Sequence, residues 1–119
     1  MGLLSNMFGK KQLPAPQYPE HAVIVRFTQG QSNVQPISEL EEKLMEIIST
    51  AGVGEYDGNQ IATNGSGGTL YMYGPDGDKL FNVVRPVLEA SNLTKGASVT
   101  VRYGPAKEGV KEHQIHLHS

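Results

Sequence analysis

The sequence contains no cysteine, which excludes disulfides, thiol nucleophiles, iron–sulfur clusters and thiolate zinc sites. The absence of disulfides fits a reducing compartment, and we expect a cytoplasmic protein. No apolar stretch approaches the ~20 residues that a helix needs to cross a bilayer, so no transmembrane segment is predicted. The N-terminus also lacks the pattern of a secretory signal, because no basic residue precedes Leu3 and Leu4.

A long run of basic residues is missing as well. The 119 residues include ten Lys and Arg against twelve Asp and Glu, which gives a formal net charge of −2. Binding to nucleic acid without sequence preference depends on positive charge at the phosphate backbone. We therefore predict no nucleic-acid partner. The length suits one domain.

Residues 1–21 differ in composition from the rest, so we divide the chain into this apolar, proline-rich segment and a domain over 22–119. One alternative for the segment is a loose tail, because so short a helix is marginal in water. The other is an apolar plug that docks on a protein partner, on its own domain or peripherally on a membrane. Its apolar residues fall on one side of a short helix and form a candidate interaction segment, Leu3, Leu4, Met7 and Phe8.

The periodicity of residues 22–119 predicts the order βαββαβ and one further strand. Ser38 and Glu41 have the spacing of a capping box at the start of the first helix, and Asp76 is a good N-cap for the second. Pro86 should kink or break that second helix. The strands are predicted at 22–28, 53–62 (with a bulge or early turn near its Gly residues), 68–73, 98–103 and 112–118.

This order predicts an α+β fold of the ferredoxin-like type. Numbered along the chain, the strands should form an antiparallel sheet in the order 5-4-1-3-2, with both helices on one face because the crossovers are right-handed. One set of alternating strand residues is apolar and should lie under the helices. These residues are Val23, Val25, Phe27, Leu70, Met72, Val99 and Val101.

The other alternating set should lie on the helix-free face. We expect Arg26 near Tyr71 and Tyr73, with Arg102 one strand away. Tyr and Arg dominate binding hot spots, so this face is a candidate recognition surface. A solvated face whose arginines pack on tyrosine rings is the alternative. Thr100 should share this face, and the predicted binding residues on it are Arg26, Tyr71, Tyr73, Arg102, Glu55 and Asp57.

Two further patterns suggest chemistry but do not complete a site. His116 and His118 lie two apart on a strand, as metal ligands can, yet no third ligand is evident beyond His113 or His21. Glu55 and Asp57 form a carboxylate pair with no visible third group for acid–base work. We predict no catalytic residue, no metal site and no cofactor.

Four segments together resemble a group of small, uncharacterised bacterial proteins. They are 54–58 (GEYDG), 70–76 (LYMYGPD), 85–89 (RPVLE) and 102–105 (RYGP), and the resemblance extends over residues 23–105. It implies no activity, so no site residue follows from it. Residues 55–58 are also similar to a segment of the bacterial ribonuclease E regulator family, which is similar in fold class; four residues imply no function.

The sequence favours a non-enzymatic interaction or regulatory module that binds a protein partner through its helix-free face or its N-terminal segment. An inhibitor or immunity-type role belongs to this class, because a slightly acidic module can mask a basic partner. The alternative is a small-molecule-binding domain or enzyme in which Arg26 and Arg102 hold an anion. Homodimerisation, edge to edge or face to face, is a third possibility.

Overall fold

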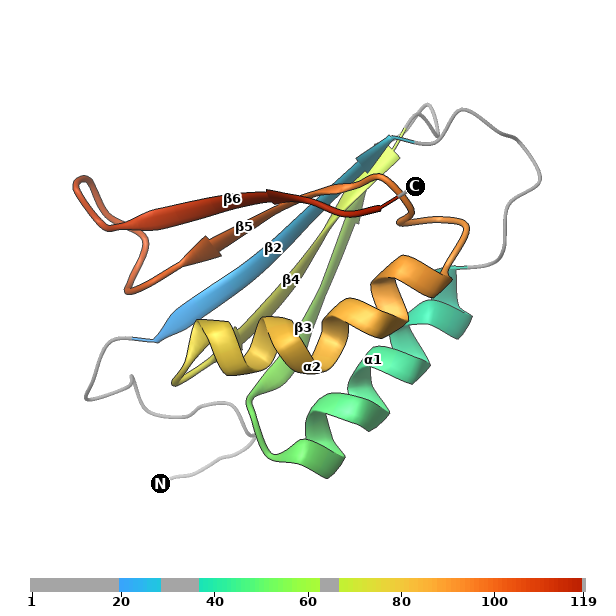
Figure 1. The fold of residues 1–119 in the computed structure, drawn as a ribbon, viewed down its shortest axis with the longest axis horizontal. Coiled ribbons are helices and arrows are strands. Elements are labelled where there is room, and N and C mark those ends of the chain that lie inside the picture. Colours follow the sequence, from blue (N-terminus) through green and yellow to red (C-terminus); the bar gives the residue numbers. More distant parts are fainter. Residues whose placement is uncertain (1–19, 29–36, 63–66, 119) are drawn as a thin grey trace, which may run out of the picture.

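The computed structural model describes residues 20–28, 37–62 and 67–118. Five strands and two helices follow one another along the chain (Figure 1). In chain order they are β2 (His21–Thr28), α1 (Ile37–Ala51), β3 (Glu55–Ile61), β4 (Gly67–Gly74), α2 (Gly77–Ala90), β5 (Ser98–Arg102) and β6 (Glu112–His116). The predicted α+β class is confirmed.

All five strands belong to one antiparallel sheet with the order β3-β4-β2-β5-β6. The central strand β2 pairs with β4 on one side and with β5 on the other, so that Val25 lies between Leu70 and Val99. The expected irregularity in β3 is a bulge between Tyr56 and Gly58. The first and third predicted strands are therefore neighbours, as expected.

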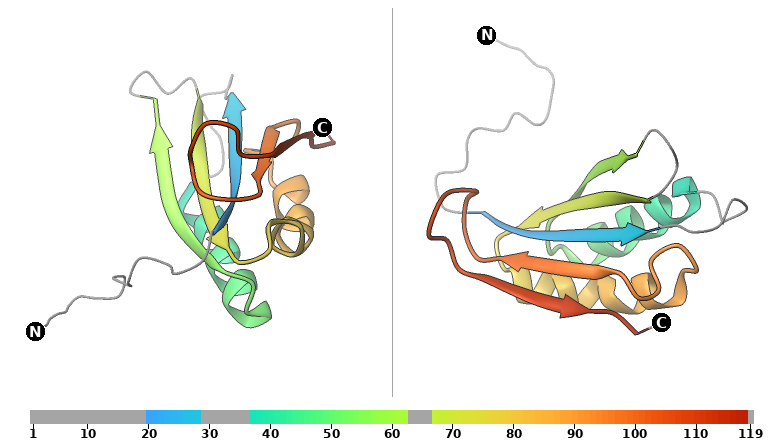
Figure 2. Two further views of the ribbon diagram at one scale, coloured as in Figure 1. Left: turned by 90° about the vertical axis from the view of Figure 1, so that its left-hand side faces the viewer. Right: turned by 90° about the horizontal axis from the view of Figure 1, so that it is seen from above.

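The two helices lie on the same face of the sheet, which we call the covered face (Figure 2). Every strand residue that the alternation predicts to be apolar and inward is buried there, and each contributes roughly 1.5–3 kcal/mol by leaving water. They pack against the buried residues of the helices: Leu40, Leu44 and Ile48 from α1, and Leu80, Phe81, Val84 and Leu88 from α2.

The predicted capping box at the start of α1 is not observed. The helix begins at Ile37, so Ser38 lies inside the first turn. The Glu41 carboxylate instead reaches the edge of the sheet, where it accepts hydrogen bonds from the hydroxyl of Tyr56 (2.6 Å) and from the side-chain amide of Asn59. Burial and this bond to Glu41 raise the pKa of Tyr56 well above its usual range. Glu41 therefore attaches α1 to β3.

Helix α2 begins as predicted. The Asp76 side chain accepts hydrogen bonds from the backbone amides of Asp78 (3.1 Å) and Lys79 (3.2 Å). Of the two predicted effects of Pro86, the break is wrong, because α2 continues to Ala90, and the kink stays a prediction. Proline has no backbone N–H, so the carbonyl of Asn82, four residues earlier, loses its helical donor. Both residues are exposed, so water can donate to that carbonyl instead.

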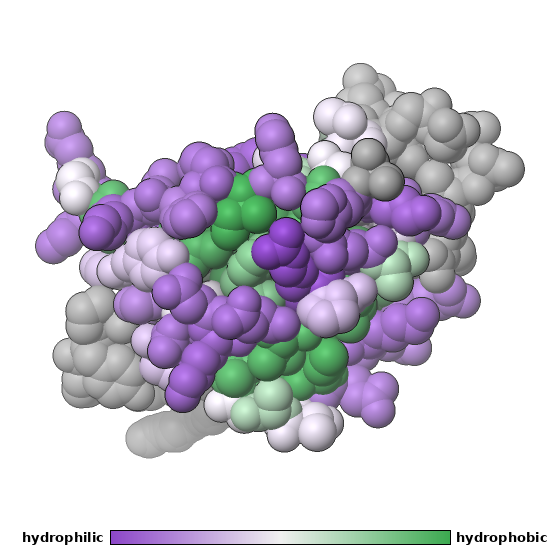
Figure 3. All heavy atoms as spheres, in the orientation of Figure 1, coloured by the Kyte–Doolittle hydropathy of each residue, from purple (hydrophilic) through white to green (hydrophobic). Residues whose placement is uncertain are grey.

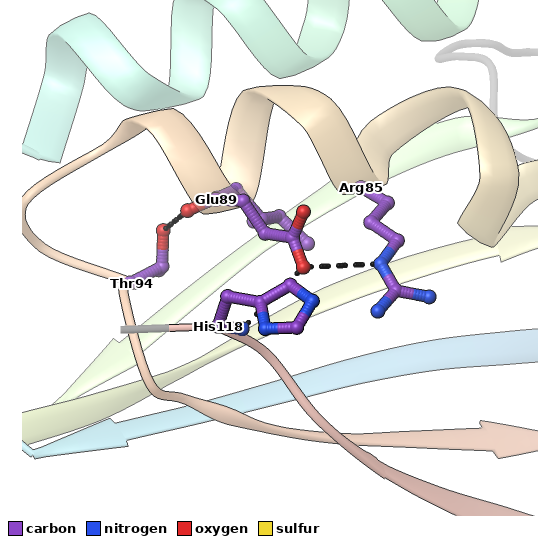
Figure 4. Close-up of polar contacts among 5 residues, drawn as sticks. Arg85, Glu89, Thr94 and His118 are labelled. Carbon is purple, nitrogen blue, oxygen red and sulfur yellow. Dashed lines mark hydrogen bonds and ion pairs between the residues drawn. The ribbon is translucent and has the colours of Figure 1, made fainter.

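The chain leaves the sheet after His116, two residues before the predicted end of the last strand. Leu117 is buried in the core, and the backbone amide of His118 donates to Glu89 on α2 at 3.4 Å (Figure 4). Glu89 also pairs with Arg85 at 3.1 Å, and this bond is the main reason that its pKa is lowered. The Thr94 hydroxyl donates to the carbonyl of Leu88 at 2.7 Å and closes the turn after α2.

Neither of the two helices that the structure describes has the length and apolar character needed to cross a membrane.

Candidate functional site

The face of the sheet opposite the helices, which we call the open face, is uncovered by any element that the structure describes (Figure 2). The strand register arranges its residues in rows that run across the sheet. One row contains Gln60, Thr69, Arg26, Ser98 and His116, the next Gly58, Tyr71, Ile24, Thr100 and Gln114, and the third Glu55, Tyr73, Ala22, Arg102 and Glu112.

A chain of hydrogen bonds crosses three strands of the open face. The Arg26 guanidinium donates to the Thr100 hydroxyl (3.3 Å), and that hydroxyl donates to the side-chain carbonyl of Gln114 (2.9 Å). Thr100 is buried although it faces away from the helices. The bonds satisfy this buried hydroxyl and hold Arg26 in position, so the guanidinium is oriented before any ligand arrives.

Two further pairs join neighbouring strands on the same face. The Tyr71 hydroxyl donates to the side chain of Gln60 on β3 at 2.9 Å, and Ser98 Oγ lies 3.4 Å from His116 Nδ1 on β6. Arg102 is held differently, because its Nε donates to the backbone carbonyl of Gly104 at 2.8 Å. Most of the polar side chains on this face are thus oriented by a neighbour.

The structure corrects the expected grouping of the arginines and tyrosines. Arg26 pairs in register with Thr69, diagonal to Tyr71 but four residues along the strand from Tyr73, which is roughly 13 Å. Arg102 and Tyr73 instead flank the small side chain of Ala22 in one row. The prediction that Arg26 lies near Tyr73 is therefore wrong, because sequence alternation gives the face of a residue but not its register.

The acidic residues of the predicted site surround Tyr73. Glu55 is its partner on β3, and Asp57 is the extra residue of the bulge. Burial, and then the negative charge of Asp57, raise the pKa of Tyr73, while the positive charge of Arg102 opposes them. Tyr73 thus remains a protonated hydrogen-bond donor at neutral pH, beside one guanidinium and two carboxylates.

Within residues 20–28, 37–62 and 67–118, neither Arg26 nor Arg102 forms an ion pair. Both guanidinium groups keep donors that the described part of the protein does not use. The open face can therefore offer two directional cationic groups to a carboxylate, a phosphate or a row of backbone carbonyls.

Several residues of this face were not among the predicted binding residues. Gln60, Ser98 and Gln114 share it with the predicted residues, and Ile24 and Ala22 form its apolar floor. Alternation gives the face of Ser98, Ile24 and Ala22, since each stands two or four positions from Arg26 or Arg102 on its own strand. The face of Gln60 depends on the bulge, and β6 carries no predicted binding residue to compare with Gln114. What the sequence did not supply is the register that brings them into hydrogen-bonding distance.

A second polar region lies where α2 meets the β5–β6 hairpin. A hollow of about 370 Å³ is lined there by Asp78, Tyr103, Lys111, Glu112 and His113. The Tyr103 hydroxyl donates to Asp78 at 2.7 Å, and this bond raises the pKa of Tyr103 to about 12.

The ring of His21 supports this region from the central strand. It lies edge-on to Tyr103 at 5.5 Å, and its Nδ1 accepts from the backbone amide of Gly77 at 2.9 Å. These contacts fix the first turn of α2 against the sheet. We therefore interpret the region as structural.

The groove between the two helices is more apolar. It encloses about 330 Å³ and is lined by Leu40, Lys43, Pro86, Val87, Ala90 and Ser91. Figure 3 shows the apolar surface between α1 and α2 with hydrophilic side chains around it. Among the lining residues that the structure describes, most are small or aliphatic and only Lys43 is charged, so they offer mainly apolar contact.

No cluster of three or more potential metal ligands occurs among the residues that the structure describes. His116 ends β6, His118 lies beyond it, and His113 belongs to the alternate set that faces away from the open face. The candidate interaction segment, with Leu3, Leu4, Met7 and Phe8, lies outside the described residues.

No family model matches this chain, and neither the curated proteins nor the solved structures contain a match to it.

Proposed function

We propose that this protein is a non-enzymatic interaction or regulatory module that binds a protein partner through its open face. One observation carries the proposal. Arg26 and Arg102, neither of them in an ion pair within the described ranges, stand beside Tyr71 and Tyr73 on a sheet face that no described element covers.

Side chains of the open face are already oriented before a partner binds. Arg26 and Tyr71 are each held by a cross-strand hydrogen bond, so little side-chain freedom is lost when a partner arrives. The tyrosine ring and the aliphatic part of the arginine side chain offer a large contact area, and the hydroxyl and guanidinium donors make the hydrogen bonds directional.

The ferredoxin-like assignment of the fold is our inference from the strand order and from the two helices on one face. Such folds serve many functions, so the fold alone does not support the proposal. The net charge of −2 suits an inhibitor or immunity-type module that masks a basic partner. A bacterial cytoplasmic setting, suggested by the resemblance to small bacterial proteins, is part of the same proposal.

The test compares capture of partners by matched variants. Tagged wild-type protein, Arg102→Ala and Tyr73→Ala are used as baits in bacterial lysate, with Arg85→Ala on α2 as the control that loses the same charge elsewhere. We expect one set of captured proteins to be lost with both open-face variants and kept with Arg85→Ala. Equal capture by all four baits would refute the role of the open face.

A fifth bait lacking residues 1–17 separates the open face from the N-terminal segment. Under the proposal this bait retains the same captured proteins. Loss of capture with this bait alone would assign binding to Leu3, Leu4, Met7 and Phe8 instead.

One arrangement favours a second candidate, a small-molecule site for an anion. Tyr73 and Arg102 flank Ala22 in one row, and a small anion above this row could accept bonds from both side chains. Titration of the protein with inorganic phosphate, followed by backbone amide NMR shifts, tests this candidate. Saturable shifts at Ala22, Tyr73 and Arg102 that vanish in Arg102→Ala would support it, and unchanged spectra would end it.

A further inference from the structure

The two edges of the sheet differ in how well they can accept another strand. At one edge, β3 carries a bulge between Tyr56 and Gly58, which interrupts a regular ladder. At the other edge, β6 pairs with β5 through five consecutive residues, Glu112–His116, without a shift in register. Figure 2 shows β6 as the outermost strand on its side of the sheet. A regular edge strand is a template for pairing with a further strand.

The hydrogen bonds at both ends of the β5–β6 pair reveal which backbone groups of β6 point outward. The Leu117 amide donates to the carbonyl of Ala97, and the Tyr103 amide donates to the carbonyl of Lys111, both at 2.9 Å. Odd-numbered residues of β6 therefore bond to β5. By the alternation of an antiparallel ladder, Glu112, Gln114 and His116 direct their amides and carbonyls to the free edge.

We propose that two copies of this chain pair through β6, antiparallel and with Gln114 opposite its counterpart. This register pairs all three outward-directed residues with outward-directed residues, so the backbone bonds of one ladder can form. It also places Glu112 of each copy opposite His116 of the other. The sequence of β6 is therefore self-complementary about Gln114.

The side chains at this edge have unused bonding capacity. The Glu112 carboxylate makes no ion pair or side-chain hydrogen bond within the residues that the structure describes. The Nδ1 atom of His116 lies beside the Ser98 hydroxyl, so its Nε2 atom is available to bond a carboxylate. Gln114 uses its side-chain carbonyl for Thr100, which leaves its amide group for the opposing Gln114.

The register is specific because alternatives lose these pairs. A shift by two residues in either direction leaves one outward residue of each copy unpaired and separates Glu112 from His116. In the symmetric register the three side chains lie on the open face, so two open faces join into one continuous surface. The pairing uses the edge and not the predicted binding residues, so it does not depend on the proposed function.

The interface is short, so we expect a reversible dimer whose population rises with concentration. Sedimentation velocity of the purified full chain over a concentration series measures it, with no other protein present. Glu112→Arg places a guanidinium opposite His116, and His116→Glu places carboxylates opposite each other. Each substitution changes both symmetric pairs, and we expect dimerisation to weaken about tenfold.

Mixing the two variants is the sharpest arm of the experiment. In a mixed dimer, Glu112→Arg of one copy faces His116→Glu of the other at one pair, and the second pair is the native Glu112–His116, so association should return to at least the wild-type level. The control is His113→Glu, which makes the same change as His116→Glu on the other side of the same strand and should leave dimerisation unchanged.

A backbone variant keeps the test independent of side-chain charge. The backbone N–H of Gln114 points away from β5. Gln114→Pro therefore removes one outward backbone donor and leaves the hydrogen bonds between β5 and β6 in place. Circular dichroism melting checks that each variant is folded. The expected result is a monomer for Gln114→Pro. A wild-type monomer at every concentration, a dimer that survives Gln114→Pro, or a dimer insensitive to the charge exchanges would each overturn the proposal.

Discussion

On the covered face, neighbouring strands meet through fully buried carbon side chains such as Val25, Leu70 and Val99. On the open face, the same strands meet through hydrogen bonds such as that from Arg26 to Thr100. Burial of apolar area dominates folding free energy, whereas a hydrogen bond at the surface exchanges one polar partner for another. The comparison teaches that the covered face holds the sheet together and leaves the open face available for recognition.

The largest expected effect comes from substituting two adjacent residues that point to opposite faces. Leu70→Ala should lower the free energy of unfolding by about 2–5 kcal/mol, because it leaves a cavity under the helices. Tyr71→Ala, one residue further along β4, should cost less than about 1 kcal/mol. Urea unfolding of both variants measures the difference. Equal losses would show that the open face contributes to stability as much as the core does.

The next effect concerns the distance between the covered face and α2. A Cβ added at Gly77 would lie 2.8 Å from Cγ1 of the buried Val101 and 3.2 Å from Cβ of His21. Gly77→Ala should therefore destabilise the protein by about 1–3 kcal/mol, even though Ala favours a helix. Asn82→Ala, at an exposed position of the same helix, is the control and should be neutral or slightly stabilising. A stabilising Gly77→Ala would mean that α2 packs less closely on the sheet.

These comparisons also separate what the sequence could predict from what it could not. Apolar residues recur at every second position of β2, β4 and β5, so the inward set that includes Val23, Met72 and Val101 was predictable, although Ala22 and Ile24 make the first half of β2 apolar on both faces. The strand positions, the Asp76 cap and the bulge in β3 were predictable for similar local reasons. Each of these features depends on residues close together in the chain.

Contacts between distant segments were not predictable in this way. Glu41 has a capping spacing, yet it bonds to Tyr56 on the sheet, because tertiary contact outweighs a local motif. The neighbours of Arg26 and Arg102 depend on strand register, which the alternation of polar and apolar residues leaves open. Of the expected neighbours on this face, the proximity of Arg26 to Tyr73 was therefore wrong, whereas Arg26 does lie diagonal to Tyr71.

Two tyrosines offer a smaller test, one on each face. Tyr56 is half-buried beside α1 and donates to the charged Glu41, so Tyr56→Phe should cost about 1–2 kcal/mol. Tyr71 donates to Gln60 at the exposed surface, and Tyr71→Phe should cost less than about 0.5 kcal/mol. Thermal melting by calorimetry measures both, since each variant keeps the ring. The reverse order would contradict the view that the polar contacts of the open face add little stability.

The smallest effect appears only at alkaline pH. It concerns the physical cause that raises the pKa of each of two tyrosines, Tyr103 and Tyr73. The bond from Tyr103 to Asp78 is the main cause that raises its pKa to about 12, whereas burial is the main cause for Tyr73 on the open face, ahead of Asp57. Asp78→Ala should therefore bring the pKa of Tyr103 back toward about 10, and Asp57→Ala should lower that of Tyr73 less. Titration of the tyrosine ring carbons by NMR measures both.

The raised pKa of Tyr103 determines whether the free energy of unfolding rises or falls with pH under alkaline conditions. The folded state holds the Tyr103 proton more tightly than the unfolded chain does, so the unfolded chain ionises first as the pH rises. The stabilising contribution is present below about pH 10 and is lost between about pH 10 and 12. Asp78→Ala should flatten the stability curve over this range, with Asp57→Ala changing it less. A curve that Asp78→Ala leaves unaltered would mean that burial, as at Tyr73, governs both tyrosines.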